Sequence, residues 1–131
     1  MTESRWIGEA TILAIHDAPL AEHGGRPGLR DAGLLRSALT RPINRVAYTA
    51  ADAFDRAASY AFGMARNHPF VDGNKRTAHV AAEWFLLKHG LELAAGDEDA
   101  VRSMLSLADD TVSEVEFAAW LRTNNIPFAA A

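Results

Sequence analysis

Apolar residues recur at helical spacing along most of the chain, and little of it alternates apolar with polar residues as half-buried strands do. The pattern is clearest over residues 52–67 and 74–89, where one face is apolar and the opposite face is charged. Gly90 follows the second segment, where a left-handed residue commonly ends a helix. The pattern predicts an all-α bundle of about six helices.

The first 51 residues show a less regular pattern. Pro19 lies inside a helical segment and predicts a break or a kink near Asp17. Asp31 is placed to cap a short helix that we expect to end at Pro42. Residues 41–51 have weak periodicity, so we interpret them as an irregular loop and a candidate substrate flap.

The last third of the chain predicts two further packing helices. One covers residues 101–108, and Ser113 with Glu116 forms a capping-box pattern ahead of the other. We find no internal repeat and no linker, so the chain is expected to form a single domain over residues 1–131.

Composition narrows the function classes. With Lys+Arg 13 against Asp+Glu 17, the net charge is -4, which predicts no direct DNA binding and no attraction to anionic membranes. The sequence has no cysteine, which excludes disulfides, thiolate metal sites and a cysteine nucleophile. It shows neither a signal peptide nor a run of about 18 apolar residues, so we expect a cytoplasmic protein.

The candidate catalytic and binding residues are concentrated in residues 68–76, which join the two best-defined helices. Gly73 gives the backbone freedom to turn, and the amides at the start of the next helix can face an anion. Lys75 adds a point charge and Arg76 a planar fork for two phosphate oxygens. We therefore predict a phosphate-binding site formed by Gly73, Asn74, Lys75 and Arg76.

Two neighbouring side chains complete this candidate site. Asp72 is an oxygen ligand of the kind that holds Mg²⁺ together with substrate phosphates. Histidine side chains can take up and release protons near neutral pH, so His68 is a candidate to accept a proton from an attacking hydroxyl. Each of these residues alone is more often a cap, a turn or a solvated charge, but their combined spacing favours phosphoryl or nucleotidyl transfer.

The segment HPFVDGNKRTA resembles the signature of the Fic/Doc family. The Fic branch typically reads H-P-F-x-[D/E]-G-N-G-R-x-x-R, from which this chain departs at Lys75 and His79. The Doc branch typically reads H-x-F-x-[D/N]-[A/G]-N-K-R, which this chain meets throughout. The likeness extends over roughly residues 12–123, through HDAPLAEHGGRPGLRDAGLLRSALTRP, ARNHPF and EFAAWLRTN.

The resemblance implies a function. Doc toxins transfer the terminal phosphate of ATP to a threonine of elongation factor Tu and arrest translation, whereas Fic proteins transfer AMP to a hydroxyl. By position, the resemblance assigns the general base to His68, the Mg²⁺ ligand to Asp72, phosphate binding to Asn74, Lys75 and Arg76, and the loop anchor to Phe70. It also implies an antitoxin partner whose C-terminal segment folds onto the toxin.

Three hypotheses stay open: a toxin kinase, a Fic-type nucleotidyltransferase and a non-catalytic interaction domain. Lys75 fills space that a glycine leaves for inner phosphates, and His79 removes a cation, so both favour phosphate over AMP transfer. Many Fic proteins carry an inhibitory helix with Glu four residues after Ser or Thr, a spacing that this sequence lacks. We therefore expect inhibition by a separate protein.

Histidines outside the signature carry no predicted chemistry. His16, His23 and His89 are isolated from one another and from any carboxylate pair at ligand spacing. We expect structural or surface roles for them and no second metal site.

Overall fold

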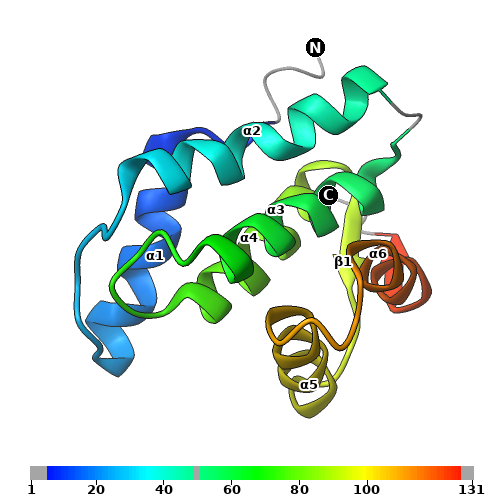
Figure 1. Ribbon diagram of the computed structural model, residues 1–131. Coiled ribbons are helices and arrows are strands. Elements are labelled where there is room, and N and C mark those ends of the chain that lie inside the picture. The colour runs from blue at the N-terminus through cyan, green and yellow to red at the C-terminus, as the bar shows by residue number, and fades with distance from the viewer. Residues whose placement is uncertain (1–5, 49–50, 128–131) are drawn as a thin grey trace.

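The computed structural model describes residues 6–48 and 51–127, and these form six helices and one small antiparallel sheet (Figure 1). The elements are, in chain order, α1 (Glu9–His23), α2 (Ala32–Tyr48), α3 (Ala53–Asn67), α4 (Asn74–Lys88), β1 (Leu91–Leu93), α5 (Asp97–Ala108), α6 (Glu114–Thr123) and β2 (Asn125–Pro127). The predicted all-α class is confirmed. Within the described residues, no helix is both long and apolar enough to cross a bilayer.

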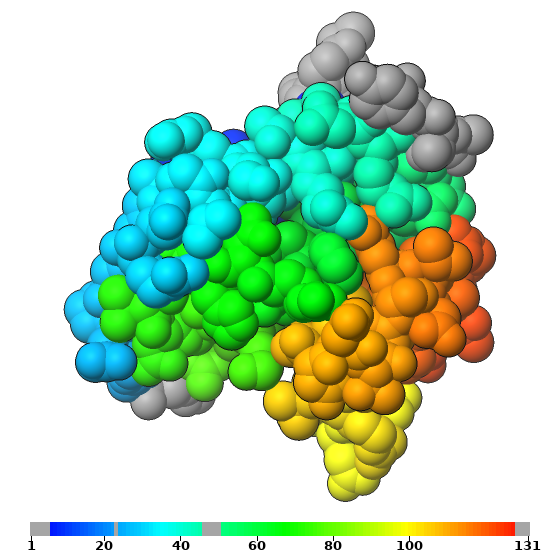
Figure 2. Space-filling view, in the orientation of Figure 1, coloured from blue at the N-terminus to red at the C-terminus, as the bar shows by residue number. Residues whose placement is uncertain are grey.

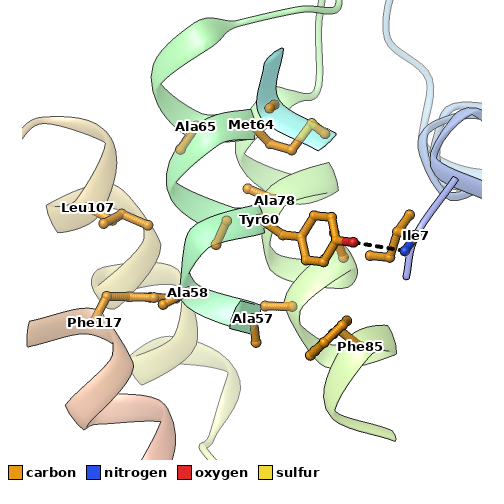
Figure 3. Packing of buried hydrophobic residues seen from close by; sticks show 14 of the residues in the cluster. Ile7, Ala57, Ala58, Tyr60, Met64, Ala65, Ala78, Phe85, Leu107 and Phe117 are labelled. Atoms are coloured by element: carbon orange, nitrogen blue, oxygen red, sulfur yellow. Dashed lines mark hydrogen bonds between the residues drawn. The ribbon is translucent and has the colours of Figure 1, made fainter. Parts of the chain in front are cut away.

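Helix α3 is the centre of the fold, packed against α2, α4 and α6. Its buried face consists largely of small residues, which lets neighbouring helices approach closely. At Gly63, an added Cβ would lie only 2.9 Å from the Cβ of Ala38 on α2. Figure 3 shows Phe117 of α6 and Phe85 of α4 on opposite sides of this helix. The core is therefore arranged around α3, whose C-terminal end leads into the 68–76 segment.

Tyr60 links this core to the N-terminal segment. Its ring is fully buried, and its hydroxyl oxygen accepts a hydrogen bond of 2.9 Å from the backbone N–H of Ile7 (Figure 3). Burial raises the pKa of Tyr60 to about 12, so the phenol stays neutral and can keep this contact.

The caps predicted from the sequence are present at several helix ends. The Ser113 hydroxyl accepts from the N–H of Glu116, whose carboxylate accepts from the N–H of Ser113, and this box begins α6. Asp31 accepts from the N–H of Leu34 at the start of α2. Gly90 has a φ of 75°, which confirms the left-handed residue expected after α4.

The break expected near Asp17 is wrong, because α1 continues through Pro19 to His23. A proline inside a helix costs about 3 kcal/mol or more through its missing N–H and its ring. Ile12 and His16 on this helix are buried, and α1 packs on α4. Tertiary packing of the α1 face therefore outweighs the local cost of Pro19.

The helix end expected at Pro42 is also wrong, and so is the loop expected over 41–51 as far as residue 48. Helix α2 runs through Pro42 to Tyr48, and residues 49 and 50 lie outside the described part of the chain. The Pro42 ring is fully buried, so it adds apolar packing. Arg41 and Arg45 both donate to the buried carboxylate of Glu114 on α6. These long-range contacts hold the second half of α2 as a helix, and the proposed substrate flap does not exist over residues 41–48.

The two strands are the elements that the sequence pattern did not predict. Leu91 pairs with Pro127 and Leu93 with Asn125, so the sheet ties the end of the described chain to the end of α4. Each strand has only three residues, too few for an alternating pattern to stand out.

Candidate functional site

The loop between α3 and α4 turns at two left-handed residues. His68, the C-cap of α3, has φ 50° and ψ 56°, and Gly73, the N-cap of α4, has φ 76° and ψ 20°. A left-handed conformation is ordinary for glycine. For a histidine it costs on the order of 1–3 kcal/mol, so it persists only where contacts from the surrounding structure hold it. Figure 1 shows this green loop beside α1. The loop therefore depends on contacts from elsewhere in the chain.

Asn74 closes the loop from the α4 side. Its Oδ1 accepts from the N–H of Phe70 and its Nδ2 donates to the carbonyl of Phe70, both at 2.9 Å. Phe70 is buried, as expected of a loop anchor, and Asn74 is buried too. The sequence predicts phosphate contact for Asn74, but in this structure its amide binds the loop backbone.

A short segment before α2 pairs with the other edge of the loop. The carbonyl of Pro69 accepts from the N–H of Arg30 at 2.7 Å and of Asp31 at 3.0 Å. On the next residue pair, the N–H of Val71 donates to the carbonyl of Gly28 at 3.0 Å. The sequence indicates only a turn here, because a pairing between segments about 40 residues apart leaves no local pattern.

The Arg30 side chain holds the end of α3. Its guanidinium donates to the carbonyl of Asn67 at 2.9 Å and to the carbonyl of His68 at 2.7 Å. A cation at a helix C-terminus also interacts favourably with the helix dipole. Arg30 thus fixes the strained backbone of His68, whose side chain is exposed.

His16 on α1 supports the loop from within the protein. Its ring is 3% exposed and stacks on Phe70, with 3.8 Å between ring centroids and 6° between planes. Its Nε2 lies 2.8 Å from the carbonyl oxygen of Asp72. The sequence pattern indicates no link between His16 and the site, although the position of His16 four residues after Ile12 puts both on one buried helix face.

Asp72 presents a charged carboxylate at the surface. Its Oδ2 accepts from the backbone N–H of Arg26 at 3.3 Å, and its Oδ1 accepts from the N–H of Gly73 at 2.9 Å. These two hydrogen bonds, with the nearby charges of Arg26 and Arg76, hold the pKa of Asp72 below its ordinary value. The side chain is therefore ionised near neutral pH, as a metal ligand must be.

The six predicted site residues meet around one cleft of about 360 Å³. It is lined by His68, Val71, Asp72, Gly73, Asn74, Lys75 and Arg76. The first N–H groups of a helix lack acceptors within the helix, so the start of α4 offers donors beside two cationic side chains. Figure 2 shows the green surface around residues 60–75 exposed between the cyan surface of α2 and the yellow-to-orange surface of α5. The arrangement suits an anionic ligand such as a polyphosphate.

Comparison with known proteins shows the family of this chain. The profile of the Fic/DOC family matches residues 6–86. The chain belongs to the Fic/Doc family. It is 39% identical over 90 residues to "Protein kinase doc" of Escherichia phage P1, covering 68% of this chain and 71% of that protein. It is 45% identical over 96 residues to "Toxin Doc" of Mycolicibacterium smegmatis, covering 70% of this chain and 68% of that protein.

The carboxylate of this Fic/Doc site would suit a magnesium ion that is coordinated jointly by phosphate oxygens and water. Within residues 6–48 and 51–127, no three His, Asp or Glu side chains are grouped so that they could hold a metal. Mg²⁺ commonly uses one or two carboxylates together with substrate phosphates and water. Among the described residues that line the cleft, Asp72 supplies such a carboxylate, beside the cations that would hold the phosphates.

A second hollow of about 310 Å³ adjoins the Fic/Doc cleft, and Lys75 and Arg76 line both. Its other lining residues come from α4 and α5 and are His79, Asp97, Ala100, Val101, Met104 and Leu105. His79, which stands where Fic sequences have their last arginine, lies 3.4 Å from Glu83. An anionic side chain therefore lies next to the position where Fic sequences have a cation.

Proposed function

We propose that this protein is a Doc-like toxin that transfers the γ-phosphate of ATP to a hydroxyl of a translation factor, elongation factor Tu. The observation that carries the proposal is the cleft in which His68, the ionised Asp72 and the cationic start of α4 face one space. The names of the relatives, a protein kinase and a toxin, support the same reading.

The residues would divide the reaction as follows. The start of α4, Lys75 and Arg76 bind the phosphates and offset their negative charge. His68 accepts the proton of the attacking hydroxyl while that oxygen bonds to the γ-phosphorus and ADP leaves. Mg²⁺, held by Asp72 and the phosphates, would neutralise charge on the transferred group.

The same cleft is compatible with AMP transfer, so the experiment must separate the two reactions. We expect label from γ-phosphate ATP, and none from α-phosphate ATP, on elongation factor Tu incubated with the purified protein and Mg²⁺. The His68→Ala variant is the control for contaminating kinases. Label from the α-phosphate would instead indicate a Fic-type nucleotidyltransferase, and no label on any protein of a cell extract would favour an interaction domain.

We also propose that the protein acts in a type II toxin–antitoxin system. A small phosphotransferase acting on a translation factor works in the cytoplasm and harms its host unless it is restrained. The relative named Toxin Doc supports such a role. The antitoxin would bind through a C-terminal segment that folds on the toxin surface, a mode in which an otherwise disordered peptide becomes helical on binding.

A further inference from the structure

His16 contacts the 68–76 segment at the residue that would hold the metal. A carbonyl oxygen can only accept a hydrogen bond, so at 2.8 Å from the oxygen of Asp72 the Nε2 of His16 carries the hydrogen and donates it. The histidine is 56 positions away in the sequence and almost completely buried. It thus supplies an internal donor to an otherwise exposed turn.

The contact fixes a whole peptide plane. The carbonyl of Asp72 and the N–H of Gly73 belong to the same planar peptide group, so they cannot rotate independently. The inner end of this plane binds His16, and its outer end donates to the Asp72 carboxylate at 2.9 Å. Turning the plane would break both hydrogen bonds. The orientation of the carboxylate is therefore linked through one rigid group to the buried imidazole.

The imidazole cannot shift without disturbing other parts of the loop. Its ring lies flat on Phe70, and the Phe70 backbone is held on both sides by Asn74. A Cβ added at Gly73 would lie 3.7 Å from Nε2, so the ring also packs under the left-handed turn. His16 is thus held by packing in the position from which it donates.

We propose that His16 is a positioning residue that, through the Gly73 amide, orients the Asp72 carboxylate toward the phosphate cleft. The proposal rests on the proposed function, because it assigns that orientation to binding of a magnesium nucleotide. Residues that orient a metal ligand typically change metal affinity by about 10- to 100-fold when they are removed. Loss of the His16 donor should therefore weaken metal binding and leave most of the fold intact.

Two substitutions separate the donor from the packing. His16→Gln keeps an N–H donor at a similar distance from the backbone. His16→Leu keeps a side chain that can pack on Phe70 but removes the donor. The binding measurement is the affinity for Mn²⁺, used in place of Mg²⁺, by electron paramagnetic resonance with a non-hydrolysable ATP analogue present. We expect a 10- to 100-fold loss for His16→Leu and less than about 3-fold for His16→Gln. His89→Leu, at the opposite end of α4, is the matched control and should leave Mn²⁺ affinity unchanged.

A second measurement does not depend on nucleotide binding. In ¹⁵N-labelled protein, the Gly73 amide signal should shift and exchange faster in His16→Leu, and remain close to the unchanged protein in His16→Gln. If His16→Leu does not fold, His16→Asn replaces it, because its shorter amide does not reach the Asp72 carbonyl.

The outcomes distinguish the two proposals. An unmoved Gly73 amide, or equal Mn²⁺ affinity, in the donor-free variant would overturn the positioning role. A His16→Gln variant as impaired as His16→Leu would overturn it too. If the unchanged protein binds neither Mn²⁺ nor nucleotide, the proposed function fails, while the Gly73 signal still reports whether His16 orients the turn.

Discussion

The side-chain amide of Asn74 forms two hydrogen bonds of 2.9 Å with the N–H and the carbonyl of Phe70. These two hydrogen bonds close the loop into a ring at Asn74, the first residue of α4, in the interior of the protein. The loop backbone beside the cleft is therefore held by contacts within the protein. Catalytic sites benefit from such preorganisation because no free energy is spent on ordering the loop when substrate binds.

The first prediction concerns this ring. Asn74→Ala leaves the buried N–H and carbonyl of Phe70 without partners, which should lower the free energy of unfolding by about 1–3 kcal/mol. Urea denaturation measures the loss. Asn74→Asp should not restore stability, because a carboxylate can accept from the N–H of Phe70 but has no donor for its carbonyl. Full stability of either variant would contradict the role given to Asn74.

The second prediction concerns the proposed base. His68→Asn should lower the rate of phosphate transfer by about 10²- to 10⁴-fold, because the hydroxyl proton loses its acceptor. Asn tolerates the left-handed backbone found at this position, and the His68 side chain is exposed, so the melting temperature should hardly change. The rate with labelled ATP and the thermal melt check both parts. A fully active variant would exclude His68 as the base.

The third prediction concerns Asp72. Asp72→Asn removes the ionised oxygen that we assign to Mg²⁺, so the Mg²⁺ concentration for half-maximal activity should rise at least tenfold, an order-of-magnitude expectation for a lost ligand. Val71→Ala, beside it in the cleft, is the control and keeps the charge. Equal activity of the unchanged protein with Mg²⁺ and with excess EDTA would show that the reaction does not require the metal.

The sequence alone predicted the parts of the fold that local chemistry decides. Helices α3 and α4 have clear apolar faces, and their connecting loop follows a specific motif. The Ser113 cap and the Gly90 turn depend only on nearby residues. The residues assigned to the cleft are close in sequence, so the turn between two helices was enough to bring them together.

The features that the sequence pattern predicted wrongly or missed depend on contacts between distant residues. Helix α2 continues past Pro42 because Glu114, about 70 positions later, binds Arg41 and Arg45. His16 joins the site because α1 packs where Phe70 and Asp72 turn. The prediction missed these features because periodicity and capping patterns report only the nearest turns of the chain.

The fourth prediction concerns the pH dependence of stability. Burial raises the pKa of Asp52, but the N–H of Asp55 and the guanidinium of Arg122 outweigh it, so the pKa lies below its ordinary value of 3.8. A lowered pKa in the folded state means that the contribution is present above about pH 4 and is lost as pH falls through the folded pKa.

Asp52→Ala should therefore lower the free energy of unfolding by about 1 kcal/mol at pH 7, mainly through the lost cap of α3. The difference from the unchanged protein should shrink as pH falls below 4. Arg122→Gln, which keeps the cap and removes the half-exposed ion pair, should cost less. Urea unfolding at several pH values measures the free energy of unfolding of both variants. A difference between Asp52→Ala and the unchanged protein that grows at acidic pH would contradict the assignment.

The last prediction concerns the partner. We expect that expression of this protein alone arrests growth, because the cleft is open to nucleotide and its proposed catalytic residues are exposed. Co-expression with the product of a small neighbouring gene should restore growth, and the two proteins should purify as a stable complex. His68→Ala is the decisive control: it should be harmless when expressed alone and should still bind the same partner, since it removes the chemistry and leaves the docking surface. Toxicity that persists in His68→Ala would mean that the harm does not come from phosphate transfer. Harmless high-level expression of the unchanged protein, with no partner that purifies with it, would contradict the toxin role itself.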